Sequence, residues 1–264
     1  MNPFAPDCGS LVISIDLELA PRQRMRLDDQ RRLASTTDVL IEALRNCGIA
    51  ATWAVADPAV SAATDAILAA AQDRNAGHDV AVLGDPTWIG PQAGRTRFAR
   101  ELSRRVLRAQ VAGIKVSTLV VREVALSDHL DLLVRYGITA VRDAHTARCV
   151  ATCGAEPVRY GVWRMRATHG LGDVAAGRLG ATGALRRAIA RAAARSEACH
   201  LAIDAAQLAL AGTGAQRRFE RVLRSIAQLR DREELSVRTM AQTARLLVPV
   251  RARRPAHSIL RPAA

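Results

Sequence analysis

Residues 11–19 read LVISIDLEL, and this stretch decides the fold class of the chain. Its composition is rich in β-formers and predicts a strand. Asp16 and Glu18 alternate with apolar residues near its end, so both carboxylates point to one face of the strand. Buried carboxylates are costly unless they are paired or bound to a metal. The two acids could supply a general base and a metal ligand, or they could mark a strand end that emerges into solvent.

Short apolar runs alternate with helical patterns along the rest of the chain, over seven or eight units. This alternation predicts a parallel sheet with helical crossovers, and the number of units favours a closed or nearly closed barrel over an open sheet. The expected strands are 11–19, 51–56, 78–83, 118–122, 139–142, 162–165, 199–204 and 235–237. The expected helices are 28–46, 58–73, 95–111, 127–137, 184–195, 216–230 and 239–247.

Function in barrels of this kind sits at the carboxyl ends of the strands. That rule directs attention to the residues that end the predicted strands, namely Asp16, Glu18, residues 83–85, Arg122, Asp143 and Asp204. The sequence contains no internal repeat, no P-loop, no G-x-G-x-x-G motif and no G-x-S-x-G motif.

The 264 residues carry a net charge of +13, which is typical of proteins that bind polyanions. Lys115 is the only lysine, however, and the abundance of arginine and alanine indicates a compositional bias. Aromatic residues make up only 3% of the chain, so the sequence does not favour nucleic acid as a partner. Arginine-rich faces at 97–108, 186–195 and 217–232 are expected to be solvated helix surfaces.

The domain organisation is expected to be a flexible N-terminus over 1–10, one barrel domain over 11–248, and a basic, disordered tail over 249–264. No apolar run is long enough for a membrane helix, and the first ten residues lack the pattern of a secretory signal. From these two observations we expect a cytoplasmic protein. The five cysteines are scattered along the chain, which indicates reduced thiols. The sequence gives no expectation for the oligomeric state.

Several segments, taken in order, resemble the polysaccharide deacetylase (NodB-homology) family. SIDLEL at 14–19 and ATWAV at 51–55 resemble its first two landmarks. GHDV at 77–80, VRE at 121–123 and YGI at 136–138 resemble later motifs, the second of which contains an arginine. HLAIDAAQL at 200–208 and LSVRTMAQTA at 235–244 resemble the closing segments, so the resemblance spans about 12–247.

The resemblance implies an α/β fold, a distorted (β/α) barrel of the NodB-homology type. It also implies metal-dependent removal of N- or O-acetyl groups from a sugar. Carried over to this sequence, Asp16 would be the base that acts on the metal-bound water and Glu18 would be a metal ligand. Arg122 would be the arginine of the third motif and a second catalytic residue.

The sequence departs from the family at the remaining metal ligands. The two family histidines correspond to Leu83 and Thr87, and the late histidine corresponds to Asp204. Leucine has no lone pair and a threonine hydroxyl is a poor neutral ligand, so loss of two of three protein ligands should abolish tight zinc binding. The sequence therefore predicts a family member that is catalytically impaired and retains a role in binding a glycan or a protein partner.

Two alternatives remain open for the acids. Asp16, Glu18, Asp85 and Asp204 could meet at the barrel mouth as an all-oxygen site for Mg²⁺, Mn²⁺ or Ca²⁺, which would make the protein an active deacetylase. Alternatively, they are solvated or paired with Arg122 or Arg142, the alternative that we favour. A third function, from another class, is that of a basic protein that binds polyanions through its arginine faces.

The three tryptophans are candidates for sugar stacking. Trp53 lies within a predicted strand and is expected in the core. Trp88 follows the altered second motif, and we expect it on a loop as an exposed platform for substrate.

Overall fold

A ten-stranded sheet forms the centre of the computed structural model, which describes residues 8–17, 27–58, 67, 77–90, 92–122, 124, 126, 128–143 and 155–247. The strands are β1 (Gly9–Asp16), β2 (Thr52–Val55), β3 (Asp79–Gly84), β4 (Val116–Val121), β5 (Ala140–Arg142), β6 (Ala155–Pro157), β7 (Trp163–Met165), β8 (His169–Gly170), β9 (Ala198–Asp204) and β10 (Leu235–Arg238). The helices are α1 (Leu27–Asn46), α3 (Pro86–Ile89), α4 (Arg95–Val111), α5 (Leu130–Arg135), the 3₁₀-helix η1 (Arg159–Gly161), α6 (Gly172–Ala175), α7 (Ala181–Ala194), α8 (Ala205–Asp231) and α9 (Met240–Leu247).

The strand order is β6-β7-β5-β4-β3-β2-β1-β9-β8, with β10 paired to β1. Every pair is parallel except β6 with β7. Strands β6 and β8 end this path and do not pair with each other, so the described strands form a half-barrel rather than a closed barrel. The expectation of an α/β fold with a distorted (β/α) barrel is confirmed.

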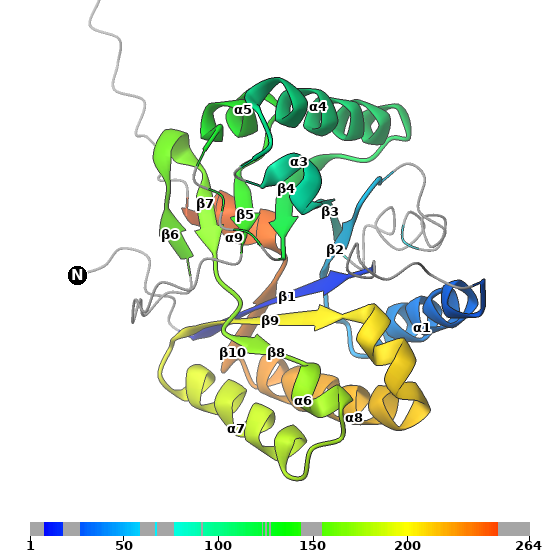
Figure 1. Cartoon of the computed structure of the whole chain (residues 1–264). Helices are drawn as coiled ribbons and strands as arrows, with labels where there is room; N and C mark the ends of the chain where they lie inside the picture. Colours follow the sequence, from blue (N-terminus) through cyan, green and yellow to red (C-terminus); the bar gives the residue numbers. More distant parts are fainter. Residues whose placement is uncertain are drawn as a thin grey trace, which may run out of the picture.

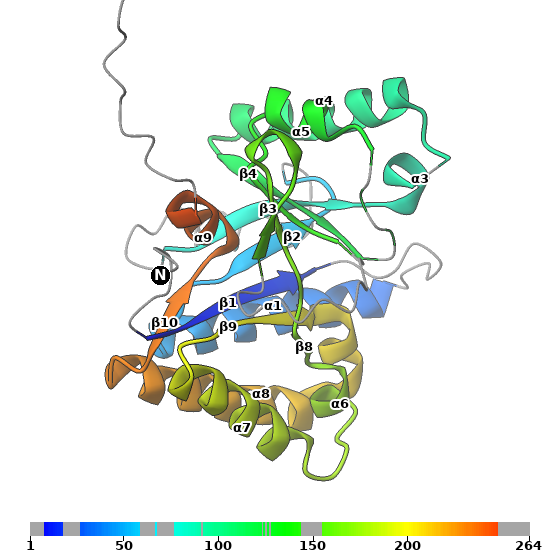
Figure 2. The ribbon, with the colours of Figure 1, turned by 90° about the vertical axis from the view of Figure 1, so that its left-hand side faces the viewer.

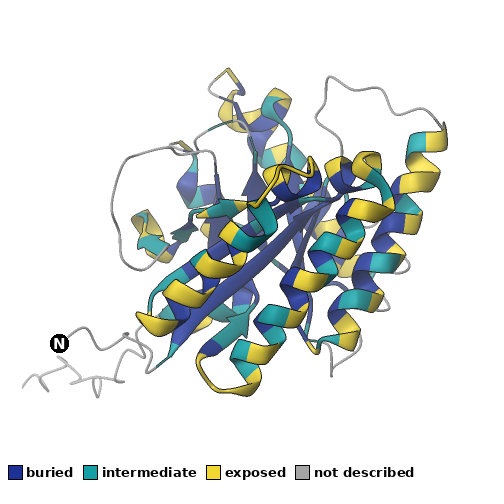
Figure 3. Ribbon diagram, turned by 90° about the horizontal axis from the view of Figure 1, so that it is seen from below, coloured by how far each residue is buried: buried dark blue, intermediate teal, exposed yellow. Residues whose placement is uncertain are grey.

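Helices cover the outer face of the sheet. Figures 1 and 2 show α4 and α5 on one side of the strands and α7 and α8 on the other. Helix α8 packs against both α1 and α7. The apolar stripes of these covering helices face the strands, and their polar residues face outward. Figure 3 shows this as the change from buried to exposed colours across each helix.

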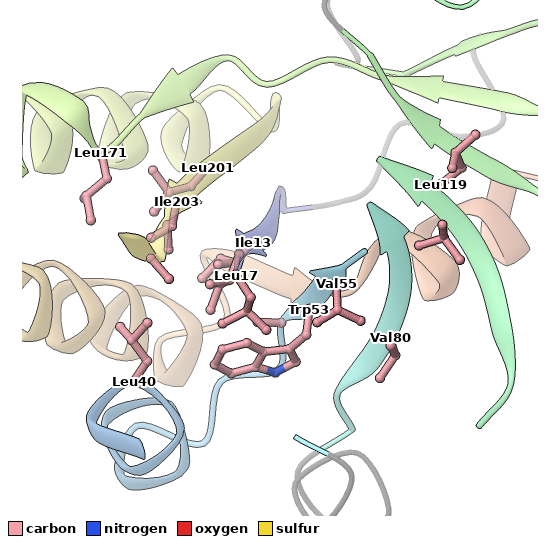
Figure 4. Packing of buried hydrophobic residues seen from close by; sticks show 14 of the residues in the cluster. Ile13, Leu17, Leu40, Trp53, Val55, Val80, Leu119, Leu171, Leu201 and Ile203 are labelled. Atoms are coloured by element: carbon pink, nitrogen blue, oxygen red, sulfur yellow. The ribbon is translucent and has the colours of Figure 1, made fainter. Parts of the chain in front are cut away.

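The period of two along β1 separates two hydrophobic clusters. Leu11, Ile13 and Ile15 point outward into the large cluster between the sheet and the helices. Figure 4 shows part of this cluster, in which Trp53 extends from β2 beside Ile13 and Leu17. Trp53 is 0% exposed, so its expected place in the core is confirmed.

The second cluster lies on the other face of the sheet, which we call the inner face. Val12 from β1 packs there with apolar residues of other strands, among them Ala54 and Ala81, and with Met240 and Ala244 of α9. Ser14 and Asp16 have the same parity as Val12, so they also point to the inner face.

The predicted elements agree with the structure to within a few residues at most ends. The sequence missed β6, β8, α3, α6 and the 3₁₀-helix η1, and α8 starts at Ala205 rather than at residue 216. The predicted helix 58–73 lies outside the described residues except for Pro58 and Ile67. No helix in the described part of the chain is long and apolar enough to cross a membrane. Residues 1–7 and 248–264 lie outside the described ranges, so the domain boundaries stay a prediction.

Candidate functional site

Asp16 ends β1 and lies between two arginines on the inner face of the sheet. Arg142, the last residue of β5, donates from Nη2 to Asp16 Oδ1 at 2.6 Å and also to Oδ2. Arg122, directly after β4, donates from Nε to Oδ2 at 3.1 Å. The side chains of Asp16 and Arg142 are 8% and 6% exposed, so this is a buried ion pair with a second guanidinium at its rim. Both carboxylate oxygens are therefore occupied by charge-assisted hydrogen bonds.

The polar network extends from Arg142 into the interior. Arg142 Nη1 donates to the hydroxyl of Ser14, and this hydroxyl lies 2.8 Å from Nε2 of His200 on β9. Burial, and after it the charge of Arg142, lowers the pKa of His200 to about 3, so the ring is neutral at physiological pH. A neutral ring accepts the Ser14 proton at Nε2 while the hydroxyl oxygen accepts from Arg142.

Asp204 closes the other end of the network. Its Oδ2 lies 3.8 Å from Arg122 Nη1, and its Oδ1 accepts from the backbone N–H groups of Ala206 and Gln207 at 3.0 and 3.1 Å. Asp204 is therefore the N-cap of α8 as well as an ion-pair partner. The expectation that acids at the barrel mouth pair with Arg122 or Arg142 is confirmed for Asp16 and Asp204.

Asp85 has a local role in helix capping. It precedes α3, and its Oδ1 accepts from the N–H of Thr87 at 2.7 Å. Leu83, which the resemblance places at the position of a family histidine, is buried on the inner face, whereas Thr87 is exposed on α3. Asp85 therefore caps its own helix, and within the described residues its side chain forms no salt bridge with Arg122 or Arg142.

The expectation for Trp88 is wrong. Its indole is buried at 2% exposure, packs against Phe98 with ring centroids 5.8 Å apart, and has the Arg105 guanidinium 4.7 Å over its ring. The reason is α3, which begins at Pro86 after the Asp85 cap and turns the indole inward instead of leaving it on a loop. A ring covered on these sides offers no open face for a sugar to stack on.

The resemblance to the polysaccharide deacetylases implies a divalent metal, and the side chains around Asp16 decide whether one fits. The described residues contain no group of three or more His, Cys, Asp or Glu side chains placed to hold a metal ion. A divalent cation at Asp16 would compete with the positive charges of Arg122 and Arg142 for the same oxygens. Glu18 lies outside the described residues, so its expected role as a ligand stays a prediction. The described donor set does not fit a divalent metal.

A second ion-pair cluster lies at the ends of β5 and β7. Asp143 Oδ2 accepts from Arg164 Nε and from the backbone N–H of Leu126, both at 3.0 Å. Arg164 Nη1 and Arg166 Nη2 donate to Glu156 at 2.8 and 2.7 Å. Burial opposes the shift, but these two hydrogen bonds lower the pKa of Glu156. Asp143, singled out from its strand end, thus joins β5 to the β6–β7 pair.

Sequence reasoning missed Ser14 and His200 as members of the Asp16 network. The parity of β1 carries the signal for Ser14, because it stands two residues before Asp16. His200 pairs in register with Val12, so it lies on the neighbouring strand close to the same layer. A histidine before an apolar strand gives no such information by itself.

No family model and no curated protein sequence matches this chain. The solved structures give clear matches of fold. A protein from Mycobacterium smegmatis named as a polysaccharide deacetylase is 15% identical, with a TM-score of 0.65 and 91% of each chain covered. A protein from Pseudomonas aeruginosa with the same designation is 10% identical, with a TM-score of 0.65 and 90% of each chain covered.

A third similar structure is a CE4 family pseudoenzyme from Bacillus anthracis. It is 10% identical, with a TM-score of 0.50 over 90% of this chain and 66% of that one. Identities this low establish shared architecture and leave the chemistry to the residues of the site. The chain therefore has the fold of the polysaccharide deacetylases, as the order of its motifs predicts.

Proposed function

We propose that this chain is a divergent polysaccharide deacetylase-like protein of carbohydrate metabolism whose catalytic site is impaired. The observation that carries the proposal is the occupation of both Asp16 oxygens by Arg142 and Arg122. A general base needs an oxygen within hydrogen-bond reach of the water or substrate that it deprotonates. The described hydrogen bonds of both Asp16 oxygens are instead with two guanidinium groups.

The donor set supports the same conclusion for the metal. Leu83 and Thr87 stand where the family carries imidazole ligands, and neither can replace one. The positive charge that a metal would bring to Asp16 is supplied here by guanidinium groups of the chain itself. Arg122, expected as a catalytic residue, is in this proposal an electrostatic partner of Asp16 and Asp204.

The retained function in this proposal is binding of a glycan, including an acetylated one, or of a protein partner in the same pathway. The support is that the barrel is preserved across nearly the whole chain while the site has changed, and that one structure of this fold is named a pseudoenzyme. Trp88 has no place in that binding surface because its ring is buried.

The test measures metal and turnover together on the purified full chain. Wild type, Asp16→Asn and Glu18→Ala are assayed for bound divalent metal and for release of acetate from N-acetylglucosamine oligomers and O-acetylated sugars. We expect substoichiometric metal in all three and no release of acetate that depends on Asp16.

Two results would overturn the proposal. One is turnover that is lost in Asp16→Asn, which would make Asp16 a base in spite of its arginines. The other is one equivalent of metal that is lost in Glu18→Ala, which would establish a carboxylate site involving the segment after β1. Asp16→Asn is preferred to alanine here because it keeps the shape of the side chain.

A further inference from the structure

Two surface grooves of similar size flank α8, and their linings differ in charge. The groove between α1 and α8 has a volume of about 350 Å³ and contains Glu42, Glu220 and Arg224. The groove between α7 and α8 has a volume of about 330 Å³ and contains Arg186, Arg187 and Arg232. Its lining includes no acidic residue. The two grooves lie on the same helix, so they provide an internal comparison.

The three arginines of the α7–α8 groove form no salt bridge with any acid in the part of the chain that the structure describes. Neighbouring arginines do: Arg230 is paired with Asp231 at 2.7 Å, and Arg224 with Glu220 at 3.4 Å. We propose that the groove between α7 and α8 binds a compact anion that carries two or more phosphate or carboxylate groups.

The residue types in the groove match that ligand chemistry. Guanidinium groups present planar pairs of N–H donors that fit the two oxygens of a carboxylate or phosphate. Ser225 and Gln228 add neutral hydrogen-bonding groups, and Ala190 and Leu229 add a small apolar surface. Gly183 leaves room for Arg187, whose Nη1 lies only 3.4 Å from where a Cβ would stand.

The lining of the groove contains no aromatic residue, and this limits the classes of ligand that it could bind. Bases and sugar rings are commonly held by stacking on aromatic faces, and this groove offers none. Recognition would therefore depend on charge and hydrogen bonding, which favours a small anion of high charge density over a single-stranded nucleic acid or a neutral glycan. This site lies among the outer helices, so the inference does not depend on the function proposed for the Asp16 network.

The test must separate a built site from the general field of a chain with a net charge of +13. The triple variant Arg186→Ala, Arg187→Ala, Arg232→Ala removes the groove cations. The matched control Arg32→Ala, Arg45→Ala, Arg97→Ala removes the same charge from exposed positions on α1 and α4. Binding of pyrophosphate and of citrate to the full chain is measured by calorimetry at about 0.15 M salt, where long-range attraction is screened beyond roughly 8 Å.

We expect at least one of the two probes to bind, and the groove triple variant to weaken it roughly tenfold or more while the control changes it less than about twofold. Tighter binding of pyrophosphate would indicate a ligand with phosphate groups, and tighter binding of citrate would indicate one with carboxylate groups. Equal weakening by both triple variants would overturn the proposal, because the net charge would then explain the binding. Failure of both probes to bind would also overturn it.

Discussion

Arginine occurs in two contrasting settings in this molecule. In the Asp16 network, Arg142 is buried and its donors meet a carboxylate and a serine hydroxyl. In the α7–α8 groove, Arg186 and Arg187 are exposed and form no ion pair within the described residues. In the Asp16 network the guanidinium of Arg142 is part of the packed interior of the barrel. In the α7–α8 groove the guanidinium groups are available to solvent or to a ligand.

The comparison shows why arginine content by itself predicts little about function. A buried guanidinium is retained only with partners that offset its loss of hydration, so it becomes part of the fold. An exposed guanidinium has little effect on stability, so its role depends on what it binds. Structural and exposed arginines are therefore distinguished by their burial and their hydrogen-bond partners, and not by the number of arginines in the chain.

The largest expected effect is that of Asp16→Ala. Removal of the carboxylate leaves Arg142 buried without its counter-ion, which should lower the free energy of unfolding by about 3–5 kcal/mol. Urea denaturation followed by circular dichroism measures it. Asp173→Ala is the control, because its pair with Arg178 is exposed and should contribute less than about 1 kcal/mol. Similar losses for both variants would remove the distinction between the two settings.

The next largest effect is expected on the pH dependence of the free energy of unfolding, through the titration of His200. An unfolded histidine titrates near 6.5 and this one near 3, so between these values the unfolded chain binds a proton that the folded chain does not. Stability should therefore fall as pH is lowered from 6.5, by about 2 kcal/mol between pH 7 and pH 5 from this residue alone.

Denaturation of wild type and His200→Gln at both pH values isolates this contribution, because glutamine can still accept from Ser14 and does not titrate. The difference in stability between pH 7 and pH 5 should be smaller in the variant by that amount. Equal pH dependence in the two proteins would mean that His200 is not held neutral by its surroundings.

Asp204 tests how much the pairing with Arg122 contributes to stability, because Asp204 is both an ion-pair partner and a helix cap. Asp204→Ala removes both roles and should cost about 1 kcal/mol of stability. Asp204→Asn keeps the cap and removes the charge, so it should recover most of the loss if capping dominates, as the long 3.8 Å separation from Arg122 indicates. If Asp204→Asn lowers the free energy of unfolding as much as Asp204→Ala does, the ion pair and not the cap accounts for the loss.

The smallest effect on stability is expected for the groove. Each of the substitutions Arg186→Ala, Arg187→Ala and Arg232→Ala should change the free energy of unfolding by less than about 0.5 kcal/mol, because none removes a buried contact. Chemical denaturation checks this on the same samples used for binding. A loss of several kcal/mol would show that these arginines belong to the structure in the manner of Arg142.

The sequence predicted a strand at 11–19, and β1 covers Gly9–Asp16. The period of a strand is a local property, so the sequence can indicate it. The favoured alternative for the acids, that they are solvated or paired with Arg122 or Arg142, is confirmed as pairing for Asp16 and Asp204, whereas Glu18 lies outside the described residues. The network also joins residues far apart in the chain, such as Asp16 and Arg142, and their contacts depend on closure of the sheet. The participation of Ser14 and His200 therefore emerged only from the structure.

Two errors have local causes. Trp88 was predicted on an open loop because a four-residue helix is too short to produce a periodic pattern, although Asp85 and Pro86 are good start signals. The start of α8 was predicted too late because Gly212, with φ of +73°, interrupts the helix and breaks the apolar period. The N-terminal part of α8 was then not recognised as helical.

The pairing of β1 has a consequence for the order of folding during synthesis. β1 is the first strand of the sheet to leave the ribosome, yet two of its three neighbours, β9 and β10, are among the last. Until β10 emerges, residues 9–12 of β1 lack one of their partner strands, and until β9 emerges the other edge of β1 is unpaired. The centre of the sheet must therefore assemble late in translation, and the nascent chain exposes an apolar strand edge that chaperones would be expected to protect.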